Sequence, residues 1–231
     1  MSRSTWDRLS AASGIGFAVT FIAAFLVAGD VPGLNDSAKD VQAWYGDNRG
    51  RVLFGVVLFG IALALFLWFV GTLANTLREA DEGRPAAVAI ASGAAIVAFA
   101  SMQAVLIAGL AHSIADTAGA GVVKALNDAQ WVVQTLVAFP AFVLVSAIAA
   151  ATLRSGVMPR WFGLASLAGA AVFAANTTTW ARDGFWAPDG AYSVIVASLV
   201  FVVWTAAAST LLLQRVMSTE EKRRMAAPLP A

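Results

Sequence analysis

The chain has 231 residues, of which 59% are hydrophobic and 13% are charged, and its formal net charge is +1. A water-soluble domain of this size could not enclose so many apolar side chains and keep a wettable surface, so the composition indicates an integral membrane protein. The near-neutral charge argues against nucleic acid as a partner. Cysteine is absent, which excludes disulfides, thiolate metal sites, iron–sulfur clusters and a cysteine nucleophile.

Six apolar runs without Asp, Glu, Lys or Arg predict six membrane-spanning helices in a single domain, residues 1–215. The runs cover about 9–29, 52–77, 86–111, 129–153, 161–180 and 191–213. Each is long enough to cross a bilayer, which takes ~20 helical residues. The expected fold class is therefore an all-α, polytopic six-transmembrane-helix bundle. Residues 216–231 are charged and then rich in Pro and Ala, which predicts a cytoplasmic tail that starts as helix and ends disordered.

The basic residues predict the orientation of these spans. If the N-terminus is cytoplasmic, ten of the fifteen Lys and Arg residues fall on inner segments, as the positive-inside rule requires. These ten are Arg3, Arg8, Arg78, Arg84, Arg154, Arg160, Arg215, Lys222, Arg223 and Arg224. We therefore expect a multi-pass inner-membrane protein with both termini in the cytoplasm.

The first outer loop, residues 30–51, is the longest. Ser37 and Asp40 have the spacing of a capping box, with Asp in place of the usual Glu. Val41, Trp44 and Tyr45 then recur at helical spacing. The loop is predicted to form a short amphipathic helix on the outer membrane surface, with its aromatic side chains at headgroup depth.

Two stretches carry a family resemblance. The motif SGVMPRWFG at 155–163, together with the FLWF run at 66–69 and its Leu77-Arg78 ending, resembles a group of uncharacterised bacterial six-span membrane proteins common in actinobacteria. The resemblance implies a bacterial origin and the helix layout. It implies no activity and no functional residue.

Uncharged polar residues and tryptophans gather in the outer halves of the third, fourth and fifth runs. The candidate ligand-binding residues are Gln103, Asn127, Gln130, Trp131, Gln134, Asn176, Thr179 and Trp180. In one interpretation they line a pocket open to the outside. In the other they form interhelical hydrogen bonds that hold the bundle together. Both interpretations stay open at the level of sequence.

We expect no catalytic residue, no metal and no cofactor. The runs contain no charged residue that could relay protons, and neither a Gly-x-Ser-x-Gly elbow nor a His-Glu-x-x-His motif occurs. His112 and Asp116 have the i, i+4 spacing of a two-ligand metal helix. A catalytic site would need a third ligand, such as Asp128 or Asp183, and the alternative is an interfacial histidine.

The leading functional interpretation is a non-enzymatic membrane protein that binds a small or lipid-like ligand from the outer side, or an accessory subunit of a membrane complex. The second is a facilitator or transporter of an uncharged or amphiphilic solute, and the third is a metal-dependent membrane enzyme. The expected partners are membrane lipids and either another membrane protein or a second copy of the chain. Nucleic acid is not expected to bind.

Overall fold

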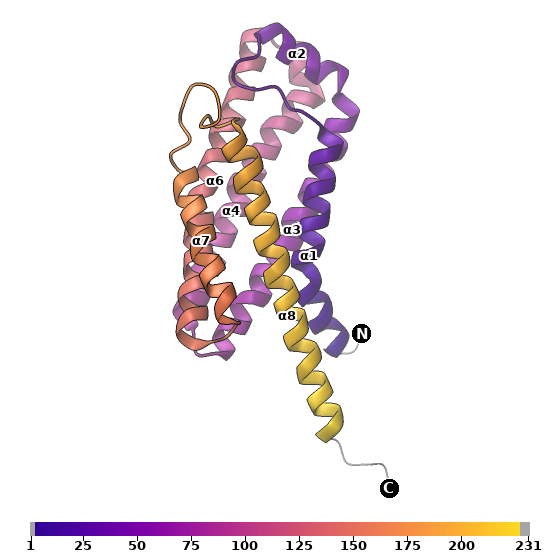
Figure 1. The fold of residues 1–231 in the computed structure, drawn as a ribbon. Coiled ribbons are helices and arrows are strands. Elements are labelled where there is room, and N and C mark those ends of the chain that lie inside the picture. The colour runs from indigo at the N-terminus through magenta and orange to yellow at the C-terminus, as the bar shows by residue number, and fades with distance from the viewer. Residues whose placement is uncertain (1–2, 227–231) are drawn as a thin grey trace.

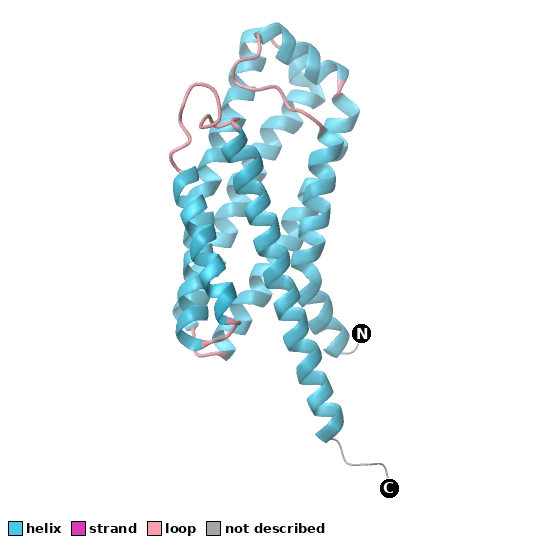
Figure 2. Cartoon of the chain, viewed as in Figure 1, coloured by secondary structure: helices cyan, strands magenta, loops and turns pink. Residues whose placement is uncertain are grey.

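A computed structural model describes residues 3–226, with side chains over 5–219, and these residues are almost entirely helical (Figures 1 and 2). The elements are α1 (Arg3–Ala28), α2 (Ala38–Asp47), α3 (Arg49–Glu79), α4 (Gly83–Gly109), η1 (Leu110–Ile114), α5 (Ala115–Thr117), α6 (Ala120–Ser155), α7 (Arg160–Asn176), η2 (Tyr192–Ala197) and α8 (Ser198–Ala226). Here η1 and η2 are π-helical turns. No strand occurs between residues 3 and 226, and the predicted all-α class is confirmed.

Five helical segments of the described chain are long and apolar enough to cross a membrane. They are Thr5–Ala28, Arg49–Glu79, Gly83–Thr117, Ala120–Ser155 and Tyr192–Thr219. The remaining predicted span corresponds to α7, which has 17 residues. At 1.5 Å per residue α7 is about 25 Å long, shorter than the ~30 Å of bilayer hydrocarbon.

Three consecutive threonines end α7 four residues before the predicted boundary. The hydroxyl groups of Thr177, Thr178 and Thr179 donate hydrogen bonds to the carbonyl oxygens of Ala174, Ala175 and Asn176, at 2.7, 2.8 and 2.8 Å. Side chains that satisfy the last carbonyls in this way compete with the next turn of helix. The apolar run therefore continues beyond the point at which the helix stops.

Other helices are longer than predicted. α6 begins at Ala120 instead of near 129. α4, which contains the third predicted span, is continued by η1 and α5 as far as Thr117. These extra turns pack with α2 in a separate buried cluster that includes Val41, Tyr45, Leu110 and Val123. Because these turns pack against protein, they are helical although their sequence is too polar to predict a membrane span. The described part of the predicted tail is helical, because α8 extends to Ala226, and 227–231 lie outside the described residues.

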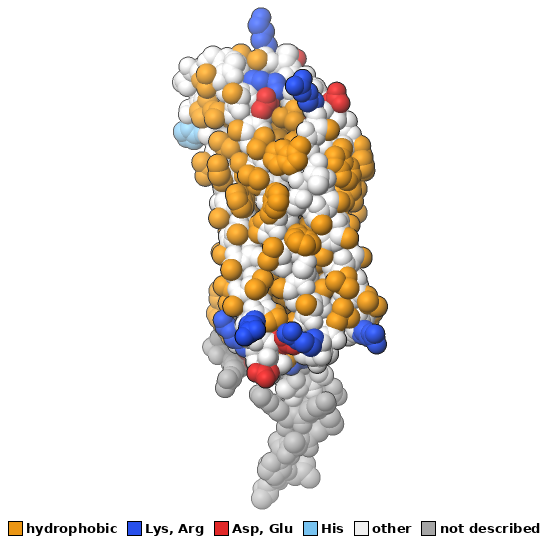
Figure 3. Space-filling model, turned by 90° about the vertical axis from the view of Figure 1, so that its left-hand side faces the viewer, with side chains coloured by type: hydrophobic (Ala, Val, Ile, Leu, Met, Phe, Trp, Pro, Cys, Tyr) orange, Lys and Arg blue, Asp and Glu red, His pale blue; other side chains and the backbone are white. Residues whose placement is uncertain are grey.

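The long helices pack in chain order around a common interior. α3 packs against α1 and α4, α6 packs against α4 and α7, and α8 returns to α1. α1 begins and α8 ends at the same end of the bundle, here called the terminal end, whereas α2 lies across the opposite end, here called the α2 end (Figure 1). A broad belt of hydrophobic side chains separates the charged side chains at the two ends (Figure 3).

The predicted capping signal of α2 is present. Ser37 is the N-cap residue, and its hydroxyl accepts a hydrogen bond from the backbone N–H of Asp40 at 3.3 Å. Val41 and Tyr45 do not face outward, because both are fully buried in the cluster that α2 forms with η1 and α6. The Tyr45 hydroxyl donates a hydrogen bond to Asn127 Oδ1 of α6 at 3.0 Å. α2 is thus docked on the protein by its aromatic face.

Candidate functional site

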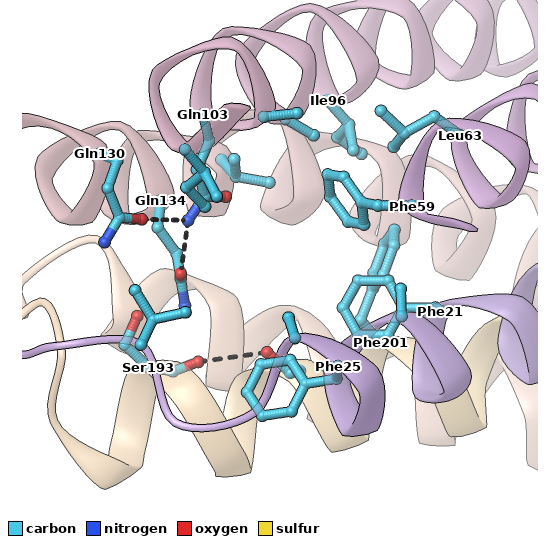
Figure 4. Close-up of a pocket in the computed structure, with 18 of the residues that line it drawn as sticks. Phe21, Phe25, Phe59, Leu63, Ile96, Gln103, Gln130, Gln134, Ser193 and Phe201 are labelled. Atoms are coloured by element: carbon cyan, nitrogen blue, oxygen red, sulfur yellow. Dashed lines mark hydrogen bonds between the residues drawn. The ribbon is translucent and has the colours of Figure 1, made fainter. Parts of the chain in front are cut away.

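Three glutamines from two helices meet inside the bundle. Gln103 of α4 donates through Nε2 to the Oε1 atoms of Gln130 and Gln134 of α6, at 2.9 and 2.8 Å (Figure 4). Gln130 and Gln134 are one helical turn apart, so their side chains share a face of α6. Both hydrogens of the Gln103 amide are used by these two bonds. This glutamine cluster joins α4 to α6.

The glutamine cluster lies at one end of a cavity with a volume of about 200 Å³. One water molecule needs about 10–15 Å³ of cavity volume, so this cavity can hold a molecule much larger than water. Seven of the chain's fourteen phenylalanines line it, namely Phe17, Phe21, Phe25, Phe59, Phe66, Phe173 and Phe201. In Figure 4 the glutamines stand at one end and the phenyl rings of Phe21, Phe59 and Phe201 at the other. The cavity therefore has one polar end and one aromatic end.

Two lining residues have buried polar atoms without a hydrogen-bond partner among the described residues. These atoms are Gln130 Nε2 and Ser193 Oγ. Leaving such a group unpaired costs about 1–3 kcal/mol, so proteins seldom do it without a reason. Each atom can donate a hydrogen bond, which makes the polar end suitable for an acceptor oxygen of a bound molecule.

Ser193 lies on η2, the π-helical turn that precedes α8. A π turn inserts an extra residue into a helix and is frequently found at functional sites. The backbone carbonyl oxygen of Ser193 accepts a hydrogen bond from Ser198 Oγ at 3.5 Å, whereas its own hydroxyl stays unpaired (Figure 4). The local widening of the helix thus coincides with a lining residue that has an unused donor.

A loop formed by residues 29–37, here called the cover loop, crosses the α2 end of the cavity. Gly29 and Val31 line the cavity from this loop. The carbonyl oxygen of Pro32 accepts hydrogen bonds from Asn127 Nδ2 at 3.0 Å and from Trp131 Nε1 at 2.8 Å. The cover loop is therefore tied across the bundle to α6.

Two further bonds hold the cover loop through Leu34. Its N–H donates to Asp189 Oδ2 at 2.7 Å, and its carbonyl oxygen accepts from Lys124 Nζ at 2.7 Å. Lys124 is also paired with Asp128 at 2.5 Å. Four hydrogen bonds, three from α6 and one from the loop before η2, thus hold the cover loop across the α2 end of the cavity.

The structure places five of the eight candidate residues in the wall of the cavity. These are Gln103, Gln130, Trp131, Gln134 and Asn176. The other three do not line the cavity. Asn127 ties α6 to the cover loop and to Tyr45. Thr179 is buried and donates to the carbonyl oxygen of Asn176, and Trp180 is half exposed and donates to the carbonyl oxygen of Thr177. The glutamines join two helices and also line a cavity, but the cover loop crosses the α2 end of this cavity instead of leaving it open.

The alternative metal ligands, His112 and Asp116, do not share an α-helix. His112 is in η1, whose π turn departs from the 3.6-residue period on which the pairing was based, and Asp116 is in α5. Both side chains are exposed, and Asp116 lies 3.8 Å from the guanidinium of Arg49. No group of three or more His, Asp or Glu side chains among the described residues could hold a metal ion.

Sequence reasoning missed the phenylalanines, Ser193 and the cover loop. One signal was available, since Phe17, Phe21 and Phe25 recur every four residues and therefore line one face of α1. Nothing in the sequence pattern marks Pro32, because its role is to accept bonds through a backbone carbonyl.

The described lining residues include no charged side chain. The cavity can therefore offer hydrogen bonds, aromatic contacts and exclusion of water, but no acid, base or counter-ion. An ionised group placed there would be desolvated without a partner, at high cost. An uncharged amphiphile fits this lining. Comparison of the chain with protein-family models, with curated proteins and with solved structures finds no match in any of the three.

Proposed function

We propose that this chain is a non-enzymatic bacterial inner-membrane protein that binds one small, uncharged, lipid-like molecule between its helices. The observation that carries the proposal is the pair of unpartnered donors, Gln130 Nε2 and Ser193 Oγ, at the polar end of an aromatic cavity. A molecule with an acceptor oxygen, such as an ester carbonyl, would use these donors. Its apolar part would lie among the phenylalanines.

The proposal includes six membrane spans, with α7 as the short one. Trp161 is exposed near the start of α7, where an aromatic side chain would sit at a membrane interface. A hydrophobic stretch shorter than the hydrocarbon is accommodated by local thinning of the bilayer at modest cost. A Cβ built at Gly169 of α7 would lie 3.6 Å from Val145 and 3.7 Å from Val200, which are ordinary contact distances, so α7 packs against both neighbours here.

The proposed orientation has the terminal end in the cytoplasm and α2 at the outer surface. Arg78, Arg84, Arg154 and Arg160 lie at helix ends at the terminal end, and Arg215 of α8 donates to the carbonyl oxygen of Val157 in the loop there, in agreement with the positive-inside rule. The glutamine cluster then lies in the outer half of the membrane. The cover loop and α2 would separate it from the outer water.

The size of the cavity also supports a bound molecule. A cavity of about 200 Å³ that stays unfilled forfeits the van der Waals energy that its lining side chains would gain from a bound molecule. A protein that retains such a cavity gains by filling it. Binding an amphiphile would recover this energy and satisfy the two donors together.

The test compares two serine variants of the purified chain in nanodiscs, with 1-monooleoylglycerol as the neutral probe and oleate as its anionic counterpart. Thermal unfolding is followed by tryptophan fluorescence. We expect monooleoylglycerol to raise the Tm of the unsubstituted chain more than oleate does. Ser193→Ala should raise the Tm without probe, because it removes an unpaired buried hydroxyl, and should reduce the shift caused by the probe.

Ser166→Ala is the matched control. Ser166 is buried on α7, donates to the carbonyl oxygen of Phe162 at 2.8 Å and accepts from Trp204 Nε1 at 2.9 Å, but it does not line the cavity. Its substitution should lower the Tm and leave the probe-induced shift unchanged. The proposal is wrong if monooleoylglycerol does not shift the unsubstituted chain, or if Ser193→Ala keeps the full shift.

A further inference from the structure

We propose that the bound molecule reaches the cavity sideways from the lipid, through an opening between α1 and the η2–α8 segment beside Phe25. This inference rests on the proposed function and adds the route by which the molecule enters. Three features of the structure support it: the closed outer side, the unequal fastening of α1 and α8, and the position of Phe25.

The outer side of the cavity is covered. Pro32 and Leu34 of the cover loop take part in four hydrogen bonds to Asn127, Trp131, Lys124 and Asp189. A molecule that came from the outer water would have to break several of these bonds. A molecule already dissolved in the membrane would not.

α1 and α8 are fastened toward the terminal end. Ser209 Oγ of α8 donates to the carbonyl oxygen of Ala11 at 2.5 Å and accepts from the N–H of Ile15 at 3.1 Å. At Gly14 the two helices are so close that an added Cβ would lie 2.8 Å from Ser209. From this crossing α8 slants away from α1 toward the top of α7 (Figure 1). Beyond the crossing, α1 and the η2–α8 segment both line the cavity, through Phe25 and Ser198 among others.

Other neighbouring helices are joined in the half of the bundle near α2. Arg51 of α3 donates through Nε and Nη2 to the carbonyl oxygen of Ala28 at 3.1 and 3.0 Å, which holds α1 to α3. The glutamine cluster holds α4 to α6. Tyr192 donates to the carbonyl oxygen of Val172 at 3.1 Å, which holds η2 to α7. Among the described residues no such hydrogen bond joins α1 to η2–α8 beyond their crossing at Ser209, which leaves this seam free to open.

Phe25 occupies this seam. It lines the cavity and is nevertheless 51% exposed, so one ring contacts both the interior and the lipid side of the bundle. Figure 4 shows its ring on α1, on the same side of the cavity as Ser193. A ring in this position can swing between rotamers without disturbing the backbone. We assign Phe25 as the side chain that a molecule must pass.

The experiment measures the rate of uptake separately from the final occupancy. The full chain in liposomes is mixed with vesicles that contain a diazirine-bearing monoacylglycerol, irradiated after different delays and analysed by mass spectrometry. Phe25→Trp should slow the appearance of labelled cavity residues, and Phe25→Ala should accelerate it. Because Phe25 also lines the cavity, the final labelling of each variant is measured separately, and the rates are compared after normalisation to it.

Leu26→Trp and Leu26→Ala are the matched controls, because Leu26 is the next residue, is 76% exposed and does not line the cavity. They should leave the rate unchanged. Lys124→Met removes one tie of the cover loop and tests the water route. If Lys124→Met accelerates uptake while the Phe25 variants have no effect, the lateral route is wrong although the cavity binds. If no chain labels the cavity at any delay, the proposed function itself is wrong.

Discussion

Asn127 and Trp131, one turn apart on α6, donate hydrogen bonds to the same atom, the carbonyl oxygen of Pro32. A carbonyl oxygen has two lone pairs, so both bonds can form at once. Asn127 also accepts a hydrogen bond from the buried hydroxyl of Tyr45. One face of α6 therefore positions both the cover loop and α2.

Asn127→Leu should lower the free energy of unfolding by about 1–3 kcal/mol, because it leaves the buried Tyr45 hydroxyl without a partner. Denaturant unfolding in mild detergent measures this change. Tyr45→Phe in the same background should recover part of the loss, since both polar partners are then gone. If the effects of the two substitutions simply add, the two side chains are not coupled through this bond.

Stability should fall at alkaline pH because of Tyr45. Burial raises the pKa of Tyr45 above its ordinary value of 10.0. The unfolded chain then releases the phenolic proton of Tyr45 at lower pH than the folded chain. The contribution of neutral Tyr45 to the free energy of unfolding is therefore complete below about pH 10 and is lost as the pH rises further. The Tm should decline more steeply between pH 9.5 and 11 in the unsubstituted chain than in Tyr45→Phe. Equal slopes would show that Tyr45 ionises as freely in the folded protein as in the unfolded chain.

The sequence predicts those features of the fold that depend on composition over long windows. Uncharged runs of twenty or more residues are helical, and Ser37 starts α2 as its capping spacing predicts. The ends of helices were less predictable because they depend on short-range competition. Thr177–Thr179 read as the end of an apolar run, yet their hydroxyls stop the helix.

The sequence predicted only part of the candidate site. Gln103, Gln130 and Gln134 are conspicuous because an amide within an apolar run needs a partner. Tyr45 was expected at headgroup depth, because an aromatic residue on a short amphipathic helix has no sequence feature that distinguishes a lipid from a protein neighbour. Likewise no pattern shows that Ser193 falls on a π turn and keeps its hydroxyl unpaired.

Gly14→Ala should destabilise the protein by about 1–3 kcal/mol, because overpacking a tight contact forces neighbours to move. A Cβ at this position would lie 2.7 Å from Phe69 Cδ2 and 2.8 Å from Ser209 Cβ. Gly60→Ala is the control, since a Cβ there has no atom within 4 Å and the change improves helix propensity. The two variants should shift the Tm in opposite directions. A shift in the same direction would contradict the close crossing of α1 and α8.

Glu82 should make the terminal end sensitive to acid. The Arg154 guanidinium, which donates to both carboxylate oxygens of Glu82, holds the pKa of Glu82 below its ordinary value of 4.5. The stability that this pair provides is complete when the pH is above the ordinary pKa of Glu82. It is lost as the pH falls through the lower pKa that Glu82 has in the folded chain. Glu82→Gln should flatten the Tm profile below pH 4.5, measured against the exposed Glu79→Gln. If both variants retain the profile of the unsubstituted chain, the pair does not contribute to acid sensitivity.

The glutamine cluster allows stability to be separated from binding. Gln103→Leu removes the donor that both Gln130 Oε1 and Gln134 Oε1 use, so two amides lose their partner and the free energy of unfolding should fall by about 1–3 kcal/mol. Replacing all three glutamines by leucine removes donors and acceptors together, which is nearly neutral when the shapes are similar. The triple variant should therefore unfold close to the unsubstituted chain. It should nevertheless lose the Tm shift caused by monooleoylglycerol, because none of the three glutamine amides then faces the polar end of the cavity. If the triple variant keeps that shift, the cluster serves only to join α4 to α6, and the cavity does not recognise a polar head through it.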